Sequence, residues 1–152
     1  PILTTKYINI LKSMSRFNYE SDFSLVQEDV YASWLETIVA SENKILGEIS
    51  YIFCDDEYLH SINMQYLNHD TLTDIISFDY TEGDIISGDI FVSIERVVDN
   101  AKDFNVPFDE ELKRVLAHGV LHYCGYKDKS DDDALLMRSK EEEKIKLFHV
   151  EL

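Results

Sequence analysis

The side chains best suited to chemistry lie in one segment, AHGVLHYCGYKDK at residues 117–129. His118 and His122 are four residues apart on a predicted helix, so both imidazoles project from one face and can share a metal ion. Gly125 can end that helix through a left-handed turn, which lets Asp128 return over the same face as a third, oxygen ligand. Two imidazoles and one carboxylate leave one coordination position open for water, as a catalytic zinc-like site requires.

The spacing matches the metzincin pattern H-E-x-x-H-x-x-G-x-x-H in geometry but lacks its glutamate. That glutamate follows the first histidine and activates water, whereas this chain has Gly119 there, so a protease is not expected. Either the general base comes from elsewhere or the substrate needs less of one. A glycine inside a helix costs about 1 kcal/mol relative to alanine. Gly119 therefore predicts close approach by another backbone or by a substrate. An isolated pair of histidines at this spacing is also common in ordinary helices.

Strands among helices are expected to position these residues. Segments rich in apolar and β-branched residues predict strands at residues 45–53, 73–80 and 88–93. Apolar residues at helical spacing predict helices, whose starts are marked by Ser24 with Gln27 as its capping-box partner, Asp55 or Asp56, Ser93, Pro107 with Asp109, and Ser130. The stripe of the first helix includes Val26 and Trp34, and the mixed charges of residues 138–146 predict a solvated face.

This pattern has no repeat and no linker, so residues 1–152 are expected to form one compact α/β (or α+β) domain. A small mixed sheet is packed by about five helices. The metal site lies on a helix of the C-terminal half and on the loop that follows it.

Composition limits the function further. Hydrophobic residues make up 45% of the chain, which excludes disorder, and 30 acidic against 14 basic residues give a net charge of −16. Such a surface repels polyphosphates at long range, which excludes DNA-wrapping and membrane-adhering basic proteins. No apolar stretch reaches the roughly 18 residues that span a bilayer, and a soluble cytoplasmic protein is expected. Cys54 and Cys124 are too few for a disulfide scaffold and are expected to be buried.

Residues 118–128 resemble the signature H-G-x-L-H-x-x-G-Y-D-H of the YbeY family of metal-dependent endoribonucleases. The segment GDIFVSIE at residues 88–95 is similar to that family's G-D-I-x-I-x-x-E. A third block, residues 59–78, is similar to L-N-x-x-Y-R-x-x-x-x-x-T-D-V-L-S-F through Asn63, Tyr66, Thr73, Asp74, Ser77 and Phe78. The resemblance spans about residues 45–128, in order and with ordinary spacing.

The resemblance implies a small α/β domain with a mixed, mostly antiparallel sheet and a metal site of three ligands, the first two matching His118 and His122. It also implies a single-strand-specific endoribonuclease that acts in processing small-subunit ribosomal RNA and in ribosome maturation. Ribosomal RNA and small-subunit ribosomal proteins are the expected partners, with no DNA and no membrane. The expected cofactor is one divalent ion, zinc, with nickel, cobalt or iron also compatible.

Three positions depart from the family pattern. The third ligand, a histidine in the family, is Asp128 here, because the signature's D-H has become Lys127-Asp128. Aspartate can bind zinc through oxygen, but it lowers the net charge of the site and makes a bound water less acidic. The family arginine after the tyrosine is Leu67, which cannot replace a guanidinium that contacts phosphate. The proline expected after Ser-Phe is Asp79.

Other side chains are candidates for the missing positive charge. Arg114 lies one turn before His118 on the same helix face and is expected to bind substrate and to act with His118 in catalysis. Lys127 adjoins Asp128, and His69 lies in the loop after the second helix; both are candidates for substrate binding. Together with Lys113 and Lys129, these cations predict a positively charged, metal-centred cleft on an acidic body. Each can also be an ordinary solvated side chain, which is the preferred interpretation for Lys129.

Two further functions fit the same residues. Leu67 and the acidic composition are compatible with a ribosome-associated maturation factor that cleaves little or no RNA itself. An open metal site is equally compatible with hydrolysis of a small phosphorylated or amide substrate, because the site alone does not name its substrate.

Overall fold

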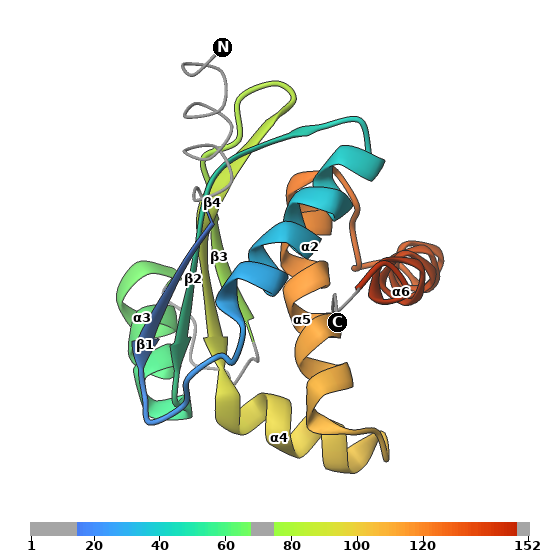
Figure 1. Cartoon of the computed structure of the whole chain (residues 1–152). Coiled ribbons are helices and arrows are strands. Elements are labelled where there is room, and N and C mark those ends of the chain that lie inside the picture. The colour runs from blue at the N-terminus through green and yellow to red at the C-terminus, as the bar shows by residue number, and fades with distance from the viewer. Residues whose placement is uncertain (1–14, 68–74, 149–152) are drawn as a thin grey trace.

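Four strands and five helices make up the part of the chain that the computed structural model describes, residues 15–67 and 75–148 (Figure 1). In chain order they are β1 (Ser15–Glu20), α2 (Glu28–Ser41), β2 (Ile45–Cys54), α3 (Asp56–Leu67), β3 (Ile75–Asp79), β4 (Ile85–Ser93), α4 (Ile94–Asp103), α5 (Phe108–Tyr123) and α6 (Asp131–Ile145). Within those residues no helix combines the length and the apolar character needed to cross a bilayer. The predicted α/β class and helix number are confirmed.

The strands form one mixed sheet in the order β1-β2-β4-β3. β1 and β2 pair in parallel, as do β2 and β4, and β3 is antiparallel to β4. The expected small mixed sheet is confirmed, but two of its three strand pairings are parallel, so it is not mostly antiparallel. Parallel neighbours need a crossover connection, and α2 supplies it between β1 and β2, while α3 and β3 lie between β2 and β4.

The sequence patterns did not predict β1, and they predicted a β4 that is too short. β1 alternates half-buried and exposed residues at the sheet edge. Only two of its six residues, Phe17 and Tyr19, are aromatic or apolar, which is too few for the sequence pattern to indicate a strand. β4 begins at Ile85 rather than at Gly88. Ile75–Asp79 confirms the predicted middle strand, and the first two residues of that prediction lie outside the described chain.

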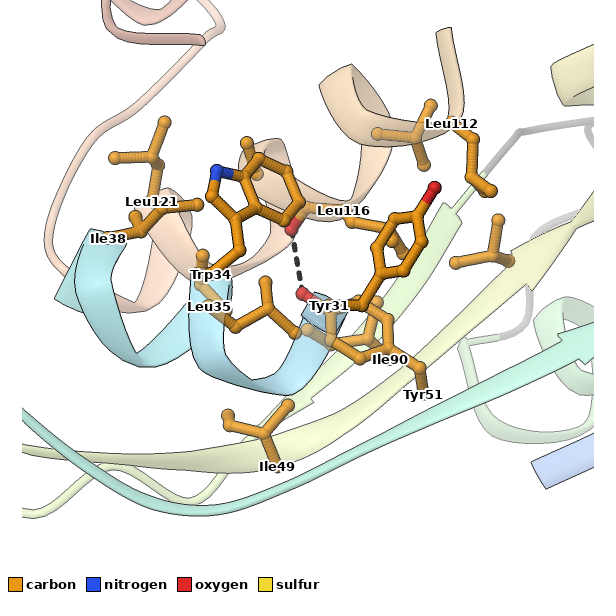
Figure 2. Close-up of a cluster of buried hydrophobic side chains, with 14 of the residues drawn as sticks. Tyr31, Trp34, Leu35, Ile38, Ile49, Tyr51, Ile90, Leu112, Leu116 and Leu121 are labelled. Carbon is orange, nitrogen blue, oxygen red and sulfur yellow. Dashed lines mark hydrogen bonds between the residues drawn. The ribbon is translucent and has the colours of Figure 1, made fainter. Parts of the chain in front are cut away.

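Helices cover both faces of the sheet because successive residues of each strand point to opposite sides. Ile90 and Val92 belong to the main core with α2 and α5, whereas Phe91 packs with Leu59 of α3 in a second cluster. In Figure 2, side chains of α2, the sheet and α5 interdigitate, and the dashed line marks the hydrogen bond that the Tyr51 hydroxyl donates to the Leu116 carbonyl, 2.7 Å long. This buried bond fixes α5 against β2.

Close approach at Gly119 is confirmed, but the neighbour is a side chain rather than a backbone or a substrate. A Cβ atom there would lie 2.9 Å from Cδ1 of Ile90 on the sheet. Gly88 is more constrained, since a Cβ atom would lie 2.5 Å from both the Phe78 carbonyl and the Tyr123 hydroxyl. That hydroxyl contacts the Phe78 and Asp89 carbonyl oxygens at 3.0 and 3.2 Å, within the β3–β4 pair. The absence of a side chain at these two glycines lets α5 lie close to the sheet.

Most predicted helix starts are confirmed. Asp55 accepts a hydrogen bond from the Tyr58 amide, and Ser93 and Ser130 cap α4 and α6 in the same way. The start of α2 was wrong: its N-cap is Gln27, which is in the left-handed region and makes no side-chain cap. Leu25 is buried and its amide donates to the Tyr19 hydroxyl, which holds residues 24–27 out of the helix. Val26, expected in the apolar stripe, is consequently 77% exposed.

The charged run at residues 138–146 is not a uniformly solvated face. Glu141 and Lys144 are 5% and 2% exposed, because α6 packs against α5. Lys144 donates to the Ser41 hydroxyl at 2.9 Å, and its own carbonyl accepts from the Trp34 indole at 2.8 Å. Burial of these charges is tolerated because each has polar partners.

Substitution of Gly88 by alanine is expected to lower the free energy of unfolding by about 1–3 kcal/mol, because backbone and a hydrogen-bonded hydroxyl must move. Gly119→Ala is the matched control, since Cδ1 of Ile90 is the flexible end of a side chain and alanine favours the helix by about 1 kcal/mol. Urea unfolding of both variants measures the difference. Equal stability losses at the two positions would contradict this account of the helix–sheet contact.

Both cysteines are free thiols, as predicted, with Cys54 buried and Cys124 partly buried. Burial raises the pKa of Cys54 to about 12 and that of Cys124 to about 11. Only the thiolate reacts with iodoacetamide, so at pH 8 alkylation of the native protein should be more than about 100-fold slower than in urea. Mass spectrometry over time measures both rates, and equally fast labelling in the native state would show that the thiols are accessible and ionised.

Candidate metal centre

The proposed ligands meet at the C-terminal half of α5 and the loop that follows it. His118 and His122 lie one turn apart on α5, with ring centroids 4.6 Å apart and rings nearly perpendicular. Oδ2 of Asp128, in the loop before α6, is 3.2 Å from Nε2 of His118 and 3.3 Å from Nε2 of His122. The three residues each offer a ligand atom within 4.8 Å of the others. The sequence-predicted triad is thus brought together in the structure.

The loop that returns Asp128 is fixed at both ends. α5 ends in a turn whose Tyr126 amide donates to the Leu121 carbonyl at 3.1 Å, a pattern typical of a Schellman motif. Gly125 within this turn has φ +109°, a conformation that glycine adopts without strain. Ser130 then caps α6, only two residues after Asp128. The carboxylate therefore sits on a short, doubly anchored segment.

The three donors fit a divalent metal ion of the zinc type. Ligand atoms about 2.0–2.1 Å from a tetrahedral ion lie about 3.3 Å from one another, and the two measured separations from Asp128 are 3.2 and 3.3 Å. Nitrogen and carboxylate oxygen are both ordinary zinc ligands. The triad would hold the ion through Nε2 of each histidine and a carboxylate oxygen.

Glu141 supports the first histidine, a role that sequence reasoning missed. Its Oε2 is 2.6 Å from Nδ1 of His118. As a carboxylate it can only accept, so Nδ1 carries the proton and Nε2 keeps its lone pair for a metal. A weak signal was present in the sequence, because Met137, Glu141 and Lys144 follow the spacing of one buried helical face. Met137 at the start of that spacing is apolar and buried, which could have marked the face.

Arg114 lies close to His118, as predicted, but carboxylates surround its guanidinium. Its nitrogens are 3.4 Å from Glu111, 3.4 Å from Glu141 and 2.7 Å from Glu142, and the residue is 6% exposed. Burial lowers the pKa of Arg114, but the hydrogen bond to Glu142 and the adjacent carboxylates raise it by more. The same bond lowers the pKa of Glu142. Arg114 is therefore well placed to hold Glu141 against His118.

The other predicted cations do not join the triad in the described structure. The exposed Lys127 lines a separate pocket with Cys124 and Leu136. Lys129 is exposed, as expected. His69 lies outside the described residues, as does Asp74, and Leu67 is the last residue of α3.

The triad opens into a pocket of about 470 Å³ between β3, α4, α5 and α6. Three carboxylates and two guanidinium groups line it, contributed by Glu111, Asp128, Glu141, Arg114 and Arg138. The expected positively charged cleft is therefore absent among the described lining residues, whose formal charge is −1 with neutral histidines. A bound divalent cation would reverse that sign, so attraction of an anionic substrate depends on the metal.

Fold and site together define a class: an α/β fold with a candidate metal centre made by two helix-borne histidines and a loop carboxylate. The family model described as Endoribonuclease YbeY matches residues 15–149. The chain is 74% identical to Endoribonuclease YbeY of Flavobacterium johnsoniae over 138 residues, 91% of this chain and 99% of that protein. It is 44% identical to Endoribonuclease YbeY of Karelsulcia muelleri over 129 residues, 85% of this chain and 92% of that protein.

A solved structure agrees. The solution structure of TM1509 from Thermotoga maritima superposes with a TM-score of 0.67 at 29% identity, covering 88% of each chain. The chain belongs to the YbeY family of endoribonucleases, which confirms the family resemblance drawn from the sequence motifs.

Replacement of Glu141 by glutamine should weaken zinc binding about 10- to 100-fold, because the carboxylate that orients His118 is lost while the volume is kept. Competition with a chromophoric chelator measures the affinity. Glu143→Gln is the control, since that side chain is 55% exposed and pairs only with lysines of the described chain. Unchanged affinity in a folded Glu141 variant would remove Glu141 from the metal centre.

Proposed function

We propose that this chain is a zinc-dependent endoribonuclease that hydrolyses phosphodiester bonds of small-subunit ribosomal RNA during ribosome maturation in the cytoplasm. The observation that carries the proposal is the convergence of two Nε2 atoms on one Asp128 oxygen, within an open pocket of a chain that belongs to an endoribonuclease family. Nickel, cobalt and iron(II) are also compatible with two imidazoles and a carboxylate.

The chain's own residues prepare the site for hydrolysis. A bound divalent ion supplies Lewis-acid activation of water and neutralises charge on the phosphoryl oxygens. His118 acts as a ligand rather than as a mobile base, since Glu141 engages its Nδ1 and Nε2 faces Asp128. Arg114 acts through Glu141, which it contacts at 3.4 Å, instead of reaching the phosphate itself. Asp128 replaces a neutral donor by an anion, which makes water at the site less acidic than three histidines would.

The negative net charge of the chain disfavours non-specific binding of RNA. A net charge of −16 repels a polyanion at long range, so productive binding depends on the metal-centred pocket and on presentation of the RNA. Basic small-subunit ribosomal proteins suit the acidic surface as partners. A maturation factor without nuclease activity and a hydrolase of small substrates are less favoured, because the triad geometry is intact and the relatives are endoribonucleases.

Purified protein should cleave single-stranded regions of a small-subunit ribosomal RNA fragment, and His118→Ala should reduce the rate more than about 100-fold by removing a ligand. Gel analysis of labelled RNA measures the rate, with metal content determined in parallel. Arg16→Ala, an exposed change on β1, is the control. Equal cleavage by wild type and His118→Ala would identify a contaminating nuclease and overturn the proposal, as would a rate unaffected by chelation.

A further inference from the structure

An arginine and an exposed aromatic ring face each other in the wall of the metal-site pocket. Arg138 of α6 places its guanidinium carbon 5.5 Å from the ring centroid of Phe104, which follows α4. Both residues line the same pocket as His118, His122 and Asp128. Phe104 remains 52% exposed although an apolar ring gains by burial. This pair is the part of the pocket wall best suited to hold a flat, charged ligand.

Arg138 is also the more exposed of the two pocket arginines, and so the more accessible to a ligand. Arg114 is surrounded by three carboxylates and is almost fully buried. Arg138 is exposed; among residues 15–67 and 75–148 it makes no salt bridge within 4.0 Å, and its charge acts on Glu142, whose pKa it helps to lower. The guanidinium fork matches phosphate oxygens bidentately. Arg138 is therefore the side chain that can bind a phosphate beside the metal centre. The leucine at position 67 carries no charge and cannot make that contact.

We propose that Phe104 and Arg138 form a one-nucleotide subsite for single-stranded RNA, in which the ring stacks on a base and the guanidinium binds the neighbouring phosphate. The inference rests on the proposed function and names the residues by which that site recognises its substrate. Stacking on a protein ring requires a base that is free of duplex stacking, so the subsite selects unpaired RNA. Every base has a flat face, so the subsite tolerates different sequences.

Steady-state cleavage of a fluorescent single-stranded oligoribonucleotide by the metal-loaded protein tests the subsite. Phe104→Leu and Arg138→Ala should each raise KM about fivefold or more, because one stacked base or one phosphate contact is worth that much, while kcat stays within about twofold. Phe104→Trp should retain the wild-type KM, since it keeps a stacking face. Arg16→Ala, at the opposite edge of the sheet from β3, should behave as wild type.

The salt dependence separates the two roles. Arg138→Ala should make the slope of log(kcat/KM) against log[salt] shallower by about 0.7, the value for one phosphate contact on a single strand. Phe104→Leu should leave that slope unchanged. Metal content and melting temperature, measured for each variant, distinguish loss of binding from loss of the centre or of the fold.

The outcomes are distinguishable. If wild type does not cleave RNA, the proposed function fails and the subsite fails with it. If wild type cleaves, His118→Ala does not, and Phe104→Leu and Arg138→Ala keep the wild-type KM, the subsite alone is overturned. The subsite is also overturned if the rise in KM accompanies loss of metal, or if Phe104→Trp raises KM as much as Phe104→Leu does. In either case the pair would be structural.

Discussion

Helix α5 has both histidines on one side and buries ten of its sixteen residues. Its contact with the sheet depends on the close approach of Tyr123 to Gly88 and on the hydrogen bond from the Tyr51 hydroxyl to the Leu116 carbonyl. A helix held in this way cannot rotate without breaking the main core, because interiors are close-packed. The direction of both imidazoles, and hence the position to which Asp128 must return, follows from this single interface.

A second constraint is electrostatic. Glu141 contacts Arg114 with one oxygen and His118 with the other, so a buried carboxylate is shared between a structural cation and a candidate metal ligand. Removing a charged group from its partners in a protein interior costs more than the pair contributes in isolation. Packing of α6 on α5 therefore does more than bury Met137: it sets the tautomer of His118. The contacts of Glu141 thus hold α6 against α5 and also orient His118.

The distribution of charge explains how an acidic chain can serve as a nuclease. The described lining of the pocket carries a formal charge of −1, and Arg114 is neutralised by its carboxylates. Positive potential at the site depends on the divalent ion and on Arg138 at the pocket wall. An apoprotein of net charge −16 should have little affinity for RNA, so we expect RNA binding to require a bound metal ion.

The sequence alone predicted the family, the α/β class, the helix that carries the candidate site and the three residues that the structure brings together there. Those features are local: the spacing of His118 and His122 is set by the helix, and Gly125 and Ser130 mark the turns that return Asp128. Packing between distant segments accounts for the parallel pairings, the edge strand β1, the burial of Glu141 and the enclosure of Arg114 by carboxylates. Phe104, His118, Arg138 and Glu141 converge because α4 and α6 pack against α5. Contacts between residues so distant in sequence leave no periodic signal, since they arise from packing between elements and not from the geometry of any one of them.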